Sequence, residues 1–298
     1  MSSTQRKLVT RKGEIPLPAY LPVTTFGQKY PLDNLVRPYL SRLAPAMMVS
    51  FHYAKKIEEP PPIPLFLDSG GFASLFENAK VKKQNGWGTI VVSNDEKEET
   101  IDPMMVLERQ EEIAEVGFTL DFPIPPGSSA KEAEKRMNLT VRNAKWALSN
   151  RRRKDLLLFA CIQAPDPANA RAVASELASL PFDGFALGGM VPRMRNWELV
   201  EEFTEVVLEE VGDRPLHVFG VGKPERVRQL FEMGVSSVDS SSYVKAAADG
   251  ICWWGEQRKV ENPGTFDRVN LALRNLAAWR TNEMPLSFVQ NSRSDDPF

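Results

Sequence analysis

Carboxylate and amide side chains recur in this sequence directly after short apolar runs. The runs PLFL, FTL, LLLFACI and SSV are followed by Asp68, Asp121, Gln163 and Asp239, respectively. If these runs are parallel β-strands, the four side chains meet at one edge, because the carboxyl ends of parallel barrel strands lie together. Two carboxylates that face one cavity can act as nucleophile and proton-transfer group at an anomeric carbon, as in retaining glycosidases. The pattern therefore predicts a carboxylate-dependent enzyme.

Small and aromatic residues accompany these polar side chains at the same strand ends. They are Ser69, Gly70, Phe72, Gly188, Gly189 and Phe219. Glycines at such positions let a flat ligand approach the backbone closely. A single aspartate there often only caps the next helix, and Phe72 and Phe219 could equally belong to the hydrophobic core. The whole set on one rim favours a ligand site.

Eight apolar runs predict the strands. They span residues 18–23, 46–51, 64–70, 118–123, 156–163, 185–190, 216–221 and 236–242. Continuous apolar character, without strict alternation, is typical of strands buried on both faces of a parallel sheet. We predict an α/β fold, a single (β/α)8 TIM barrel, although a large open sheet would produce similar runs.

Amphipathic stretches between the later runs predict helices. They span residues 103–116, 130–149, 167–180, 196–211, 223–233 and 268–280. Residues 76–101 are irregular, and Asn85-Gly86 within them predicts a small hairpin insertion after the third strand. We expect residues 1–280 to form the barrel and residues 281–298 to form a polar C-terminal tail.

Composition limits the remaining possibilities. The 298 residues carry a net charge of −2, so any nucleic-acid contact depends on local basic patches. The two cysteines and two histidines show no metal-ligand spacing, and we expect neither a metal site nor a zinc subdomain nor a cofactor. No apolar run approaches the roughly 20 residues needed to span a bilayer. We expect a cytoplasmic protein with no membrane contact.

Seven motifs carry a family resemblance. In order, they are LPVTTFG, FLDSGGFASLF, TLDFPIPP, CIQAP, FALGGM, FGVGKPE and VDSSSYVKAAADG, and they lie between about residues 15 and 265. Together they resemble the tRNA-guanine transglycosylases. The resemblance implies a barrel enzyme that exchanges guanine in a nucleic acid for a 7-deazaguanine base by double displacement.

The resemblance also implies a role for each polar residue. Asp239 matches the nucleophile that attacks C1′ of the target nucleotide, and Asp68 matches the general acid/base. The set that reads the base matches Asp121, Gln163, Ser69, Gly70 and the backbone of Gly188 and Gly189. Phe72 matches the aromatic residue that stacks on one face of the base. Phe219 falls near the sequence position of the family's apolar residue that covers the other face.

Departures from the family pattern bear on the substrate. The cysteine-rich zinc motif that follows the eighth strand in the bacterial and eukaryotic enzymes is reduced here to Cys252. The motif DSSSYVKAAADG resembles the archaeal branch, which inserts the nitrile base preQ0, but we expect no room for the archaeal RNA-binding domains. Val191-Pro192 stand near the place where the bacterial pattern has a glutamate, which fits a neutral base better than an amine-bearing one.

These departures resemble the DNA 7-deazaguanine transglycosylase branch, so we expect DNA rather than tRNA, together with a free 7-deazaguanine base and partner proteins of a modification cluster. The expected nucleic-acid contacts are Arg193, Arg195, Lys245, Trp253 and Arg258, each of which could equally be a surface or packing residue. A tRNA transglycosylase, a non-catalytic nucleic-acid-binding subunit and a base-releasing hydrolase remain as alternatives.

Overall fold

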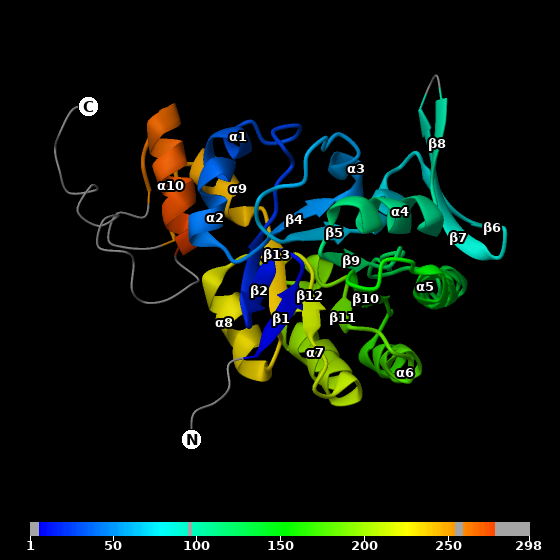
Figure 1. The fold of residues 1–298 in the computed structure, drawn as a ribbon. Coiled ribbons are helices and arrows are strands. Elements are labelled where there is room, and N and C mark those ends of the chain that lie inside the picture. Colours follow the sequence, from blue (N-terminus) through cyan, green and yellow to red (C-terminus); the bar gives the residue numbers. More distant parts are fainter. Residues whose placement is uncertain (1–5, 95–96, 254–258, 278–298) are drawn as a thin grey trace.

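Eight parallel strands form the centre of the molecule (Figure 1). The computed structural model describes residues 6–94, 97–253 and 259–277. The strands are β3 (Ala19–Pro22), β4 (Met47–Ser50), β5 (Leu65–Asp68), β9 (Val116–Phe118), β10 (Leu157–Ile162), β11 (Gly184–Leu187), β12 (Leu216–Val218) and β13 (Ser237–Ser240). The sheet runs β3-β13-β12-β11-β10-β9-β5-β4. A parallel bridge between Val23 and Met48 joins its two edges, which confirms the predicted (β/α)8 barrel.

Helices connect the strands on the outside of the barrel. They are α1 (Leu32–Val36), η1 (Arg37–Tyr39), α2 (Leu40–Leu43), α3 (Phe51–Ala54), η2 (Gly71–Leu75), α4 (Pro103–Ile113), α5 (Ala130–Asn150), α6 (Pro167–Ala178), η3 (Val191–Arg193), α7 (Trp197–Val211), α8 (Pro224–Met233), α9 (Ser242–Ala248) and α10 (Thr265–Ala277). The side chains of Asp102, Ser129, Asp166 and Asn196 accept hydrogen bonds from the first turns of α4, α5, α6 and α7. In the described part of the chain, no helix is both long enough and apolar enough to cross a membrane.

The insertion after β5 is larger than the predicted hairpin. Strands β6 (Ala79–Gln84), β7 (Trp87–Asn94) and β8 (Lys97–Ile101) form a three-stranded antiparallel sheet. Asn85 and Gly86, with φ of 50° and 91°, make the predicted turn between the first two strands. The sheet is fastened to α5, because Asn143 Oδ1 accepts a hydrogen bond from the Gly88 backbone at 2.8 Å.

A second hairpin, which the sequence did not predict, precedes the barrel. It consists of β1 (Lys7–Thr10) and β2 (Gly13–Pro16). Its apolar residues Leu8 and Ile15 pack into the same buried cluster as Phe66 and Phe159 from the barrel strands. The hairpin therefore adds to the core inside the barrel.

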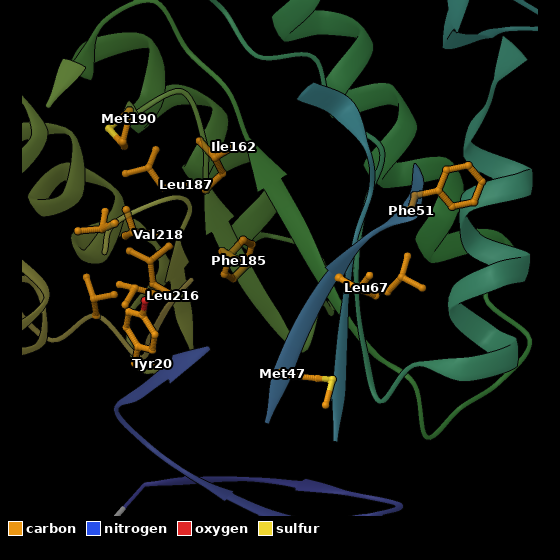
Figure 2. Close-up of a cluster of buried hydrophobic side chains, with 14 of the residues drawn as sticks. Tyr20, Met47, Phe51, Leu67, Ile162, Phe185, Leu187, Met190, Leu216 and Val218 are labelled. Atoms are coloured by element: carbon orange, nitrogen blue, oxygen red, sulfur yellow. The ribbon is translucent and has the colours of Figure 1, made fainter. Parts of the chain in front are cut away.

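Side chains alternate between the inside of the barrel and the layer beneath the helices. Figure 2 shows a cluster of buried side chains that includes Leu67, Leu187 and Val218. The residues next to them in the chain point to the other side of the sheet, the inside of the barrel. Two of these residues are Phe66 and His217, whose rings lie 6.5 Å apart. Asp68 shares its strand and its alternation with Phe66, which directs its carboxyl into the barrel.

Candidate active site

A cavity of about 480 Å³ lies at the carboxyl ends of the strands. It is lined by Met48, Asp68, Phe72, Leu75, Asp121, Pro123, Ile124, Pro125, Gln163, Gly188, Gly189, Val191, Pro192, Phe219, Gly220 and Asp239. The structure thus brings together residues that are far apart in the sequence, and most of those predicted to act at the site are among them. This is the end of a (β/α)8 barrel at which active sites are found.

Asp121 is the centre of a hydrogen-bonded network in the wall of the cavity. Ser69 Oγ donates to Asp121 Oδ1, and Gln163 Nε2 donates to Asp121 Oδ2, each at 2.6 Å. Burial raises the pKa of the Asp121 carboxyl, although the hydrogen bonds from Ser69 and Gln163 act in the opposite direction. The buried Gln163 Oε1 has no hydrogen-bond partner among the described residues. That oxygen can therefore accept a hydrogen bond from a ligand.

Glycines keep this network tightly packed. A Cβ on Gly188 would lie 2.0 Å from Gln163 Nε2, and one on Gly71 would lie 2.3 Å from Asp121 Oδ1. Gly189 has φ of +75°, a conformation that residues with side chains rarely adopt. A side chain at these positions would displace the neighbouring Gln163 or Asp121 side chain from the network. Of the remaining predicted residues, Gly70 has a left-handed backbone with φ of 78° and stands between Ser69 and the first residue of η2.

Asp68 has the electrostatic properties of a proton-transfer group. Burial raises the pKa of its carboxyl from 3.8 to about 7, with further contributions from the negative charges of Asp121 and Asp239. Hydrogen bonding to the Ser50 side chain and the Gly70 backbone acts in the opposite direction. Near neutral pH, Asp68 can therefore both give and take a proton.

Asp239 is held on one side by two nitrogen groups. The Gly220 backbone N–H donates to Oδ1 at 2.9 Å, and His217 Nε2 lies 3.1 Å from the same oxygen. Only 11% of the Asp239 side chain is exposed, and that side chain lines the cavity. His217 is not among the predicted site residues, although it lies on β12 two residues before Phe219, a spacing that indicates the same inward direction.

Two aromatic residues contribute to the cavity wall in different ways. Phe72 is 61% exposed and packs edge-on against Phe76 at 6.1 Å, so it is not a core residue. Phe219 is half-buried and packs against the rings of Phe118 and His217 at 4.9 and 4.8 Å. Phe219 therefore belongs both to the barrel core and to the cavity.

Arg193 does not lie where a nucleic-acid contact would need it. Its side chain is buried, and it donates hydrogen bonds to the carbonyls of Gly189, Ile124 and Pro165 at 2.6, 3.2 and 3.2 Å. The guanidinium also lies over the Phe203 ring. This correction to the prediction has a simple cause: the guanidinium satisfies the carbonyls of the loop that carries the glycine pair, which leaves it unavailable to a phosphate.

Three of the other residues predicted to contact nucleic acid lie in the described part of the chain. Arg195 is exposed just before α7, and Lys245 is exposed on α9 with its Nζ 5.4 Å from the centre of the Tyr30 ring. Trp253 is half-buried, and its backbone N–H donates to Asn275 Oδ1 at 2.7 Å. Arg258 lies outside the described residues, as does the predicted tail at 281–298. Among the described residues, no group of three or more histidine, cysteine or acidic side chains could hold a metal ion.

The fold and the cavity define a (β/α)8-barrel protein with a pocket lined by three carboxylates at the carboxyl ends of its strands. The family model described as queuine tRNA-ribosyltransferase matches residues 5–287, and the chain belongs to this family. The chain is 30% identical over 213 residues to the tRNA-guanine(15) transglycosylase of Methanothermobacter thermautotrophicus, a match that covers 70% of this chain and 28% of that relative.

Two further relatives with the same name come from other archaea. The Thermococcus kodakarensis protein is 32% identical over 149 residues, which is 48% of this chain and 25% of the relative. The Methanobrevibacter smithii protein is 28% identical over 216 residues, which is 70% of this chain and 29% of the relative. The chain thus spans less than a third of the length of these curated relatives.

Proposed function

We propose that the protein is a pentosyltransferase, a guanine transglycosylase that exchanges guanine in a nucleic acid for a 7-deazaguanine base. One observation carries the proposal: Asp68 and Asp239 line the same cavity as the Asp121–Gln163 network. Nucleophile, proton-transfer group and base-reading groups would then act on one bound nucleotide. Family membership supports the same activity.

The proposed reaction has two displacements at C1′ of the target nucleotide. In the first, an oxygen of Asp239 attacks C1′, the C1′–N9 bond breaks, and guanine leaves with the electron pair and the Asp68 proton. In the second, the ionised Asp68 takes a proton from the ring nitrogen of the incoming base, and that nitrogen attacks C1′. The bond to Asp239 breaks and its electron pair returns to the carboxylate, so no further reactant is required.

Base recognition is proposed for the polar wall of the cavity, and stacking for its aromatic residues. Asp121, Gln163 Oε1 and the backbone of Gly188 and Gly189 are proposed to bind the polar edge of the base, with support from Ser69 and Gly70. Phe72 and Phe219 are proposed to contact its faces. Because Val191 and Pro192 also line the cavity, we propose that the base carries a neutral 7-substituent such as the nitrile of preQ0.

Two observations point to different nucleic acids as the substrate. The missing cysteine motif predicts DNA, whereas the relatives at 28–32% identity carry the name tRNA-guanine(15) transglycosylase. The relatives support the tRNA alternative better, and we propose tRNA as the principal substrate with DNA as the competing one. A target guanine in a duplex would have to leave the base stack before Asp239 could reach its sugar.

The test is the incorporation of labelled guanine and labelled preQ0 into unmodified tRNA, duplex DNA and single-stranded DNA, side by side. Label in tRNA that is lost in Asp239→Ala supports the principal proposal, and label in DNA alone supports the competing substrate. If no nucleic acid takes up label, with or without proteins from a modification cluster, the chain is a non-catalytic binding subunit. Free base released without incorporation indicates a hydrolase.

A further inference from the structure

His217 lies directly behind the proposed nucleophile. Strands β12 and β13 pair in parallel with His217 opposite Ser237, so the imidazole bridges two inward side chains of the neighbouring strand. His217 Nδ1 lies 2.9 Å from Ser237 Oγ, and Nε2 lies 3.1 Å from Asp239 Oδ1. The residue is fully buried, and the rings of Phe118 and Phe219 pack against it.

The hydrogen-bond partners assign the proton of this imidazole. A carboxylate only accepts hydrogen bonds, so Nε2 must carry a proton and donate it to Asp239. A neutral ring then has an acceptor at Nδ1, and the Ser237 hydroxyl can donate to it. The Asp239 carboxylate therefore selects the tautomer with an N–H at Nε2, and the Ser237 hydroxyl matches it by donating to Nδ1.

The two oxygens of Asp239 consequently differ. Oδ1 accepts hydrogen bonds from His217 and from the Gly220 backbone at 3.1 and 2.9 Å. Within the described part of the chain, no hydrogen-bond donor reaches Oδ2. Oδ2 is thus the oxygen whose lone pairs are left for attack on C1′, while Oδ1 is held in place.

We propose that His217 is a positioning residue that directs Oδ2 of Asp239 toward the sugar and stabilises the carboxylate when it leaves. This inference rests on the proposed function. In the covalent intermediate, Oδ2 is bonded to C1′ and Oδ1 is the ester carbonyl. When the incoming base attacks C1′, the C1′–Oδ2 bond breaks and the returning electron pair is shared with Oδ1.

The effect on the two steps is unequal. Hydrogen bonds to a carboxylate are stronger than those to a neutral ester carbonyl. The N–H of His217 therefore stabilises the free carboxylate more than the intermediate, and it promotes the second displacement by making Asp239 a better leaving group. Without this donor the covalent complex accumulates and its release slows.

Two matched variants isolate the donor. The amide nitrogen of His217→Gln can occupy the position of Nε2 and donate to Asp239, whereas His217→Asn is one methylene shorter and reaches only the position of Nδ1. The assay forms the covalent complex on whichever nucleic acid the wild-type chain modifies, without free base, and measures its fraction on a denaturing gel. A chase with labelled guanine then gives the rate of release.

We expect His217→Asn to release the complex about 10- to 100-fold more slowly, the effect of losing one hydrogen bond to a charged group. His217→Gln is expected to stay within about threefold of wild type. Phe159→Leu, a core change in the same interior cluster, should lower the melting temperature and leave the release rate unchanged. Equal release rates for wild type and His217→Asn would overturn the proposal, as would equal slowing in both His217 variants.

A second variant covers the case in which His217→Asn does not fold. Ser237→Ala removes the donor to Nδ1 and leaves Asp239 untouched, so it should slow release in the same direction by a smaller factor, and unchanged release would overturn the role of His217. If the wild-type chain forms no covalent complex on any nucleic acid, the proposed function itself fails. A wild-type complex with unaffected variants contradicts only the role of His217.

Discussion

Gln163 Nε2 donates a hydrogen bond to Asp121 Oδ2 at 2.6 Å, and this contact determines what the pair can offer a ligand. Because Ser69 Oγ occupies the other oxygen of Asp121, both carboxylate oxygens already have a protein donor. The Gln163 amide cannot rotate without losing its contact to Asp121, which keeps Oε1 as a fixed acceptor. Such a preorganised acceptor discriminates between bases by what they can donate.

Replacement of Asp239 tests the covalent mechanism. We expect Asp239→Asn to lower base exchange by at least about a thousandfold and to abolish the covalent complex, because an amide is a poor nucleophile. The measurement is label incorporation together with gel analysis of the denatured complex. Asp249→Asn, at the exposed end of α9, is the matched control and should exchange base like wild type. A covalent complex in Asp239→Asn would assign the nucleophile to another residue.

The pH dependence of the two displacements should be opposite. Asp68, whose pKa is raised to about 7, must be protonated to assist guanine departure and ionised to accept the proton of the incoming base. Formation of the covalent complex should therefore slow as the pH rises above about 7, and its release should slow as the pH falls below about 7. Single-turnover rates of each step across the pH range measure this. Two flat profiles would remove Asp68 from proton transfer.

The same raised pKa makes Asp68 unfavourable for stability at neutral pH. The unfolded carboxyl ionises near 3.8 while the folded one keeps its proton up to about 7, so its contribution to stability falls as the pH rises between these values. Asn at this position is neutral in both states. We expect Asp68→Asn to melt several degrees above wild type at about pH 8, with the gain disappearing near pH 4.

Thermal unfolding at several pH values checks this expectation, and Asp249→Asn, which removes an exposed carboxyl outside the cavity, again serves as the control. A melting temperature of Asp68→Asn below that of wild type at high pH would show that the folded environment favours the charged form. Such a result would also contradict the proposed role of Asp68, since loss of function and gain of stability are expected together here.

The strands were predictable because burial on both faces leaves a strong signal, and each of the eight predicted runs overlaps a barrel strand. The run at 118–123 was placed too late, since β9 ends at Phe118 and Asp121 stands in the following loop. The short helix α3 was missed because four residues carry too little periodicity to be recognised. Local pattern therefore located the elements, but not their ends.

The site was predictable to a different extent. Asp68, Asp121 and Asp239 stand out because carboxylates are rarely buried, and these three all stand at the ends of apolar runs. His217 was not recognised, because a histidine inside an apolar run gives no sign of its partner on the neighbouring strand. Arg193 was misassigned because sequence cannot distinguish an arginine that binds loop carbonyls from one that faces a phosphate. Both errors concern contacts between distant segments.

A methyl group on Gly188 should damage base binding more than folding. Its Cβ would lie 2.0 Å from Gln163 Nε2 and displace the amide from Asp121. We expect Gly188→Ala to raise the KM for the free base about 10- to 100-fold, because the polar edge of the base loses its acceptor. Gly264→Ala, where the new Cβ would meet only an ordinary 3.4 Å contact, is the control. A wild-type KM in Gly188→Ala would exclude this wall from base recognition.

The identity of residue 191 should set the preference for the charge of the 7-substituent. Val191 lines the cavity and is 54% exposed, so a longer side chain can be accommodated at the rim. We expect Val191→Glu to shift the ratio of kcat/KM toward the amine-bearing base preQ1 over preQ0 by about tenfold, because a carboxylate can form a charge-assisted hydrogen bond with the amine. Val191→Gln has the same shape without the charge and should shift the ratio much less. Since a screened pair at the rim weakens with ionic strength, the shift should also shrink in high salt. An unchanged ratio in Val191→Glu would mean that the 7-substituent points to a different part of the cavity, away from Val191.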